Sequence, residues 1–368
     1  MRFTCLKENL VLGVQTVAPT ALRSGGLPVL KNIHISVEAG KITFTTTNLE
    51  LGVQHTVRGK TEEDGSCLVP AKLFLDLVSL LPEGTVTVTL EESGLRIATA
   101  DTSSSLHTIP EADFPIIPSL ENPKNEVEFL ISDFVEGLKK TQFSVGRNEQ
   151  RPQFQGVLLV LDGQTVCFAA TDGFRLAEAK GKIATQEGRV QCIVPTSAAQ
   201  EIFRMLGSLS GSVKMALGEN QACFLFDQTV VTTRLVEGDF PEYESLFPVG
   251  GTEHVVAVSA LSKAVKATAL FSRGGSSSIG VTGNADGSLD VHAESSEVGF
   301  HRTKVPATGP AGTGESITLN ARYLLDILAV ADGKVVVHLL NADRPVLVTP
   351  YEAAEGNNWR YLIMPIRG

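Results

Sequence analysis

Residues 69–81 read Val69-Pro70-Ala71-Lys72-Leu73-Phe74-Leu75-Asp76-Leu77-Val78-Ser79-Leu80-Leu81, and they predict a short amphipathic helix entered through a proline. A second stretch of this type begins at Val194 and a third at Leu319, each 125 residues after the one before it. A pattern repeated at a fixed spacing indicates a repeated structural unit. Three copies in 368 residues therefore predict three tandem domains of similar construction.

A second helical pattern, near the start of each predicted domain, supports the same repeat. It covers residues 5–18, 132–143 and 259–271, and the last two copies begin with a serine, a residue type expected at a helix N-cap. The helices of the first pattern are expected at residues 70–81, 196–207 and 320–331. We therefore expect domains that cover residues 1–125, 126–250 and 251–368.

Strands are predicted after every helix, where apolar and polar residues alternate. The first hairpin of each domain is expected at residues 32–47, 156–169 and 279–293, with turns at Ala39-Gly40, Asp162-Gly163 and Asp286-Gly287. Further hairpins are expected at residues 85–99, 212–226 and 334–349. The predicted fold class is α+β, with two helices on antiparallel sheets in each domain.

The composition, 43% apolar and 6% aromatic residues, is that of an ordinary globular protein. No apolar run is long enough to predict a membrane span, and the first residues are too charged for a signal peptide, so we expect a cytoplasmic protein with no membrane partner. The five cysteines are scattered without a Cys-x-x-Cys pair. We therefore expect neither a disulfide framework nor a metal site.

Motifs for catalysis and cofactor binding are missing from the sequence. It contains no phosphate-binding Walker loop and no Gly-x-Gly-x-x-Gly, so no cofactor is expected. The stretch Thr171-Asp172-Gly173-Phe174-Arg175 could form part of a hydrolase site if Asp172 worked with Glu178 or Asp239 as general acid and base. The same stretch is also typical of a turn after a strand. A protein-binding scaffold with no DNA role is a further alternative.

Charge is distributed unevenly between the predicted elements. The chain has a net charge of −10, yet its six predicted helices carry +2 and the remainder −12. Helices presented together could therefore meet a polyanion, although mixed charge on surface helices would give the same difference. We expect Lys72, Arg204 and Arg322 to occupy the same site in the three copies of the repeated helix.

The chain also resembles the bacterial DNA polymerase III beta sliding clamp family, over essentially its whole length. The resemblance rests on nine segments in the same order: Leu27-Pro28-Val29-Leu30-Lys31-Asn32, Thr47-Asn48-Leu49-Glu50, Val69-Pro70-Ala71-Lys72, Leu81-Pro82-Glu83-Gly84, Ala112-Asp113-Phe114-Pro115, Thr141-Gln142-Phe143-Ser144, Ala170-Thr171-Asp172-Gly173-Phe174-Arg175-Leu176-Ala177, Val236-Glu237-Gly238-Asp239-Phe240-Pro241-Glu242-Tyr243 and Tyr361-Leu362-Ile363-Met364-Pro365-Ile366-Arg367.

The resemblance implies three tandem DNA-clamp domains and a homodimeric ring with its helices inside. It implies a non-catalytic processivity factor that encircles double-stranded DNA and tethers the replicative DNA polymerase and clamp-loader subunits through short peptide motifs. Geometry agrees with a dimer, because six helices about 10 Å wide enclose a hole of only about 10 Å, whereas twelve enclose about 28 Å. The grooves of duplex DNA alone are about 6 and 12 Å wide, so the duplex needs the larger hole.

The family's sites can be transferred to this sequence. The resemblance implies DNA contacts at Arg23, Lys72, Asn148, Arg151 and Arg204. Helix position adds Lys139, Lys140, Lys263, Lys266 and Arg322 as expected DNA contacts. The implied peptide-binding residues are Phe154, Thr171, Gly173, Phe174, Arg175, Leu176, Pro241, Ser245, Leu246, Asn320, Tyr323, Leu362, Met364, Pro365 and Ile366.

Some positions depart from the family pattern. Phe174 stands where histidine is common and Ser245 where arginine is familiar, so we expect the peptide site to prefer a more apolar motif. The implied dimer interface contains Ser104 and Leu106, with Leu106 packing against Leu270 and Phe271 of the second copy. Its strand, residues 102–106, lacks the basic residues expected opposite an acidic partner.

Overall fold

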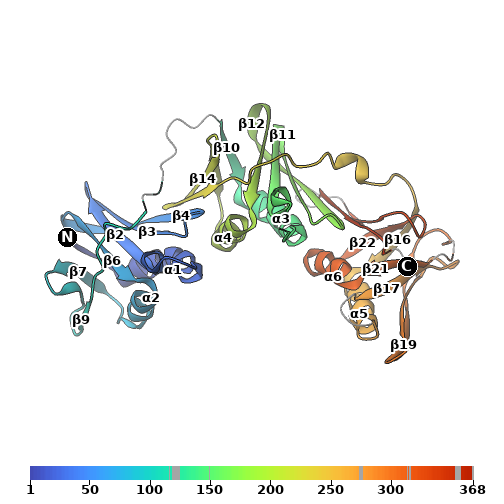
Figure 1. Cartoon of the computed structure of the whole chain (residues 1–368), viewed down its shortest axis with the longest axis horizontal. Helices are drawn as coiled ribbons and strands as arrows, with labels where there is room; N and C mark the ends of the chain where they lie inside the picture. Colours follow the sequence, from blue (N-terminus) through green and yellow to red (C-terminus); the bar gives the residue numbers. More distant parts are fainter. Residues whose placement is uncertain are drawn as a thin grey trace. The chain divides into compact units, whose positions relative to one another are not determined.

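The computed structural model of the chain (Figure 1) describes every residue except 116, 118–124, 149, 273–276, 313, 315, 353–357 and 367–368. It contains two compact units. The first combines Met1–Phe129 with Gln200–Leu235, and the second combines Leu130–Ala199 with Val236–Gly368. No helix in the described part of the chain is long and apolar enough to span a membrane.

Six α-helices occur in the described residues, close to the six positions predicted from the sequence. They are α1 (Lys7–Arg23), α2 (Ala71–Leu80), α3 (Ile131–Thr141), α4 (Thr196–Leu206), α5 (Val258–Ala269) and α6 (Ala321–Val330). Short 3-10 helices are η1 (Pro28–Lys31), η2 (Gln142–Ser144), η3 (Pro152–Phe154) and η4 (Glu244–Leu246). In Figure 1, α1 lies beside α2 in the first unit and α5 beside α6 in the second, as their contacts require.

The first unit contains two antiparallel sheets. One has the strand order β5-β1-β7-β8-β9 and the other β13-β14-β15-β4-β3-β2-β6. The strands are β1 (Arg2–Leu6), β2 (Asn32–Glu38), β3 (Lys41–Thr47), β4 (Leu51–Val57), β5 (Gly59–Glu63), β6 (Gly65–Pro70), β7 (Thr85–Glu91), β8 (Gly94–Ala98), β9 (Ser103–Leu106), β13 (Ser212–Leu217), β14 (Gln221–Phe226) and β15 (Thr229–Arg234), while β10 (Asn125–Leu130) ends at the start of the second unit.

The second unit is built in the same way. One sheet has the order β20-β16-β22-β23-β24-β12, with β11 also paired to β12, and the other has the order β19-β18-β17-β21. The strands are β11 (Gly156–Thr171), β12 (Arg175–Pro195), β16 (Thr252–Ala257), β17 (Ser278–Gly283), β18 (Leu289–Ser295), β19 (Gly299–Val305), β20 (Ala307–Thr308), β21 (Ser316–Asn320), β22 (Lys334–Leu339), β23 (Val346–Pro350) and β24 (Asn358–Ile363).

The helices bury one apolar face each, which explains why a 3.6-residue pattern identified them. In the first unit, Leu10 and Val14 of α1 and Phe74 of α2 are fully buried, and the ring of Phe74 meets the edge of the Phe44 ring at 6.0 Å between centroids. Gly13 allows α1 to approach the sheet, because a Cβ there would lie 2.6 Å from Cγ2 of Val57.

Two predicted helix caps were wrong. Helices α3 and α5 begin at Ile131 and Val258, so Ser132 and Ser259 lie inside the first turn and not at the N-cap. The reason is that each helix directly follows a strand, and the chain passes from the sheet into the helix without a polar capping residue. Helix α6 does have a side-chain cap, since Oδ1 of Asn320 accepts a hydrogen bond from the backbone N of Arg322 at 2.9 Å.

One predicted hairpin was also wrong. The Asp162-Gly163 dipeptide does not reverse the chain, because β11 continues through it to Thr171 while remaining paired with β12. The register shifts on both sides of Gly163, whose φ of 57° marks a bulge and not a turn. The chain reverses instead at residues 172–174. The hairpins predicted at residues 32–47, 85–99, 212–226, 279–293 and 334–349 are confirmed.

Candidate functional site

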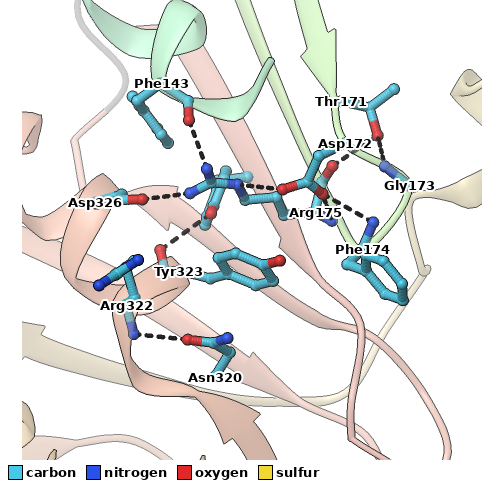
Figure 2. Close-up of polar contacts among 11 residues, drawn as sticks. Phe143, Thr171, Asp172, Gly173, Phe174, Arg175, Asn320, Arg322, Tyr323 and Asp326 are labelled. Carbon is cyan, nitrogen blue, oxygen red and sulfur yellow. Dashed lines mark hydrogen bonds and ion pairs between the residues drawn. The ribbon is translucent and has the colours of Figure 1, made fainter. Parts of the chain in front are cut away.

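The β11–β12 turn is held by side chains of its own first residues (Figure 2). Oδ1 of Asp172 accepts hydrogen bonds from the backbone N of Phe174 at 2.9 Å and of Arg175 at 3.1 Å. Oγ1 of Thr171 accepts one from the N of Gly173 at 3.0 Å and donates one to the carbonyl O of Arg175 at 2.7 Å. Gly173 has a φ of +92°, which glycine adopts without strain. The turn predicted at these residues is confirmed.

Arg175 connects this turn to two distant parts of the second unit. Its Nε donates to Oδ2 of Asp172 at 2.9 Å, its Nη2 donates to the carbonyl O of Phe143 at 2.6 Å, and its Nη1 is paired with Oδ2 of Asp326. The guanidinium lies over the ring of Tyr323, 4.5 Å from its centroid. Burial by itself lowers the pKa of Arg175, but Tyr361 and the two carboxylates outweigh it and raise the pKa, so the residue stays charged.

These contacts remove the basis of the hydrolase alternative. Both carboxylate oxygens of Asp172 are occupied by the turn and by Arg175. Glu178, one of its two suggested partners, is buried and bound by Arg360 through Nε at 2.6 Å and Nη2 at 2.9 Å. A general acid or base needs a free carboxyl group beside the substrate. Asp172 and Glu178 therefore have structural roles. Asp239, the other suggested partner, is exposed on the loop after β15, and Asp172 is not free to work with it.

The end of the chain is brought beside the turn by strand β24. Leu362 pairs with Leu176 and Ile363 with Arg175 in the β12–β24 ladder. The backbone N of Met364 then donates to the carbonyl O of Phe174 at 2.9 Å. Segments almost 190 residues apart in sequence therefore form one surface.

Exposed apolar side chains surround this junction. Phe174 is 64% exposed, Leu246 54% and Met364 40%, and Ile366 is exposed as well. We call these four residues the apolar patch. Leu176 and Leu362, each two residues from Phe174 or Met364, belong to one buried apolar cluster with Tyr243 and Phe247, the last of which follows Leu246 in the chain. Apolar side chains exposed around a rigid core are typical of a surface that binds another protein or peptide.

The predicted peptide-binding residues all belong to the second unit, but they do different things. Phe154, Thr171, Leu176 and Leu362 are buried and support the surface; Arg175, Asn320, Tyr323 and Pro365 are half-buried; Gly173, Phe174, Pro241, Ser245, Leu246, Met364 and Ile366 are exposed. Sequence analysis missed Phe143, Asp326 and Tyr361, which hold Arg175 and Tyr323 in position. The sequence does not indicate these contacts, because only the fold brings these separate segments together.

Most of the predicted DNA contacts are exposed. Exposed side chains are Arg23, Lys72, Asn148, Arg151, Arg204, Lys263, Lys266 and Arg322, and Lys139 is half-buried. Within the first unit, Arg23 Nη1 lies 3.0 Å from Oε2 of the buried Glu201, and Arg204 Nη2 lies 2.6 Å from Oε1 of the same residue. One carboxylate thus partly neutralises two of the predicted contacts.

Lys140 does not fit its predicted role as a DNA contact. Its side chain is only 2% exposed, and its Nζ lies 3.2 Å from Oε1 of Glu136 and 3.9 Å from Oδ2 of Asp332. It also donates to the carbonyl O of Val330 at the end of α6. A lysine used in this way connects α3 to α6 and offers no charge to a phosphate. Its neighbour Lys139 sits on the more exposed side of the helix, 3.4 Å from Glu136.

The expected equivalence of three basic residues was also wrong. Lys72 and Arg322 are each the second residue of their helices, α2 and α6. The second residue of α4 is Ser197, and Arg204 lies two turns further on, in the last turn. The repeat therefore places a basic residue at the same site twice, not three times.

The predicted dimer residues divide between the two units. In the second unit Leu270 is 75% exposed, and the half-buried Phe271 stacks on His301 with ring centroids 5.2 Å apart. Ser104 is half-buried on β9. Leu106, on the same strand, is buried by its own sheet and is not free to pack against Leu270 of a second copy. The predicted packing of Leu106 against Leu270 is therefore wrong.

Together the fold and these surfaces define a class of protein: a multidomain binding protein with repeated helix-on-sheet modules, an exposed apolar patch and carboxylates engaged in structural ion pairs. Comparison of the chain with known proteins identifies its family. Models of the DNA polymerase III beta subunit match residues 1–118 (N-terminal domain), 131–242 (central domain) and 244–367 (C-terminal domain). The chain belongs to the DNA polymerase III beta subunit family.

Individual relatives agree with this assignment. The beta sliding clamps of Pseudomonas aeruginosa and Vibrio cholerae are 31% and 30% identical to the chain, and both alignments cover 100% of each protein. The crystal structure of the DNA polymerase III subunit beta from Pseudomonas aeruginosa has a TM-score of 0.93 at 28% identity and covers 100% of both chains. The clamp from Bacillus subtilis, at 24% identity, has the same fold with a TM-score of 0.92.

Proposed function

We propose that the chain is a DNA sliding clamp, a non-catalytic processivity factor of which two copies close head to tail around double-stranded DNA. The observation that carries this proposal is the charge of the helices. Helices α1 to α6 contain nine basic and six acidic residues, although the whole chain has a net charge of −10. A weakly basic lining suits sliding, because phosphate contacts are independent of sequence and let a protein move along the duplex without holding it tightly.

The DNA-facing residues in this proposal are those predicted from sequence, without Lys140. They are Arg23, Lys72, Lys139, Asn148, Arg151, Arg204, Lys263, Lys266 and Arg322. All would contact phosphates and none would read bases, as enclosure without sequence preference requires. The domain boundaries after residues 125 and 250, and action in the bacterial cytoplasm, where the chromosome lies, belong to the same proposal.

The peptide-binding site of the proposal is the apolar patch together with the residues that support it. An aliphatic or aromatic side chain of a polymerase or clamp-loader tail would cover Phe174, Leu246 and Met364, and the rigid core beneath would limit the entropy lost on binding. Because Phe174 and Ser245 carry no charge, the site would favour apolar anchors over acidic ones.

Sedimentation provides the first test of the ring. A dimer of the 39.2 kDa chain at micromolar concentration is expected, and a protein that remains a monomer throughout would contradict the ring. For the peptide site, Phe174→Ala with Met364→Ala should abolish binding of a polymerase tail peptide while the mass of the dimer is unchanged. Both side chains are exposed, so the double variant is expected to fold. Unchanged peptide affinity would reject the site.

A further inference from the structure

The first unit contains a pocket beside the β3–β4 turn, far in sequence from the apolar patch. Its volume is about 370 Å³, within the range of roughly 300–1,000 Å³ that is usual for ligand sites. Its walls come from the turn, from the start of β14, from the end of β15 and from the segment after β9. The lining includes Thr47, Leu49, Glu50, Leu51, Thr233 and Arg234. We call it the β4–β15 pocket.

The turn beside this pocket repeats the β11–β12 turn bond for bond. Oγ1 of Thr47 accepts from the N of Leu49 at 3.1 Å and donates to the O of Leu51 at 3.0 Å, as Thr171 does in the second unit. Oδ1 of Asn48 accepts from the N of Glu50 at 3.1 Å and of Leu51 at 2.8 Å, as Asp172 does. The two turns are equivalent elements of the repeat.

The strand beside the turn is equivalent as well. Thr233 pairs with Leu51 in the β4–β15 ladder, as Ile363 pairs with Arg175 in the β12–β24 ladder. The next backbone N, that of Arg234, donates to the carbonyl O of Glu50 at 3.0 Å, which matches the bond from Met364 to Phe174 at 2.9 Å. The β4–β15 pocket therefore occupies, in the first unit, the place that the apolar patch occupies in the second.

The side chains at the equivalent places differ in charge. Where the apolar patch exposes Phe174 and Met364, the pocket exposes Glu50 and Arg234. Arg234 is exposed, and none of the ion pairs found among the described residues involves it, so its guanidinium can bind an anionic group. Glu50 can accept hydrogen bonds from the N–H groups of a ligand.

Leu49 contributes an apolar side chain to the pocket, and its own backbone is in a strained conformation. Its φ is +77°, a conformation that glycine adopts at the equivalent Gly173 but that is unfavourable for leucine. The strained backbone places a side chain that is 52% exposed at the rim of the pocket. Backbone strain of this kind, retained by the surrounding hydrogen bonds, is concentrated at functional sites.

We propose that the β4–β15 pocket is a second peptide-binding site, one that takes an extended segment with an aspartate or glutamate next to a branched aliphatic residue. The carboxylate would pair with Arg234 and the aliphatic side chain would cover the exposed Leu49, with the buried Leu51 in the wall behind it. The site differs from the apolar patch in its preference for charge, so the two surfaces of one chain would hold different partners.

The test is methyl NMR of the full-length protein, with labelled leucine methyl groups, titrated with the acetylated and amidated peptide Ala-Leu-Asp-Leu-Ala. The methyl signals of Leu49 and Leu51 are expected to shift and to saturate. The peptide Ala-Leu-Lys-Leu-Ala should bind about two- to fivefold more weakly, since one exposed ion pair is lost. Arg234→Glu, at an exposed position, should reverse this order of affinity.

Phe174→Ala is the matched control. It is expected to leave the shifts of Leu49 and Leu51 unchanged, because Phe174 belongs to the other unit. The proposal is overturned if those signals do not move, if both peptides bind equally to the wild-type protein, or if Phe174→Ala removes the shifts. The last result would mean that the shifts are an indirect effect of peptide bound at the apolar patch, and it would leave the proposed clamp function intact.

Discussion

Arg175 is the residue whose loss should damage the peptide site most. Its side chain is 10% exposed, and Arg175→Ala would remove the donor to Oδ2 of Asp172, to the carboxylate of Asp326 and to the carbonyl of Phe143. Removing one partner of a buried ion pair costs about 3–5 kcal/mol. Because Asp326 is 32% exposed and can recover water, we expect the lower end, about 3 kcal/mol.

The assay is differential scanning calorimetry, which measures the thermal unfolding of the full chain. For a unit of this size, about 3 kcal/mol corresponds to a fall of roughly 6–12 °C in the Tm of the transition that belongs to the second unit. Arg322→Ala, an exposed residue of α6, is the control and should change stability by no more than about 0.5 kcal/mol. A fall in Tm no larger for Arg175→Ala than for Arg322→Ala would refute the reasoning.

Other substitutions test separate parts of the structure. Lys140→Ala should lower stability by about 1–3 kcal/mol without changing DNA affinity, because the carbonyl of Val330 loses its donor and the half-buried Glu136 loses one of its two lysines; weaker DNA binding at unchanged stability would contradict its structural role. Lys72→Ala should reduce the slope of log K against log salt for duplex DNA by about 0.9, and an unchanged slope would remove it from the DNA contacts. Burial raises the pKa of the Cys192 thiol to about 12, so the thiol stays protonated below that pH. Iodoacetamide at pH 8 should therefore label Cys192 only after unfolding, and rapid labelling of the folded protein would contradict its burial.

Much of the fold could be predicted because the helices and hairpins depend on local patterns. The three copies of the repeated helix each bury a single apolar stripe, so periodicity alone located them. The prediction at Asp162-Gly163 was wrong because the structure there depends on a non-local partner. A sequence that favours a turn can instead form a bulge when the strand beside it continues, and the long partner β12 is not a local feature.

The site was less predictable than the fold. Resemblance supplied Phe174, Leu246 and Met364, but nothing in the sequence indicates that Asp326 and Phe143 bind Arg175 from segments far along the chain. The wrong prediction for Lys140 has the same cause, since its place on a helix suggested an exposed charge. Its burial depends on the end of α6, 190 residues away.

The central claim is that the protein holds DNA by enclosing it. The most direct measurement is the amount of protein that remains on a nicked circular plasmid after loading, compared with the same plasmid cut once, in a buffer of high salt that suppresses phosphate contacts. Stable retention on the circle and rapid loss from the cut DNA are predicted. Equal loss from both would contradict enclosure, because electrostatic binding does not depend on whether the DNA has ends.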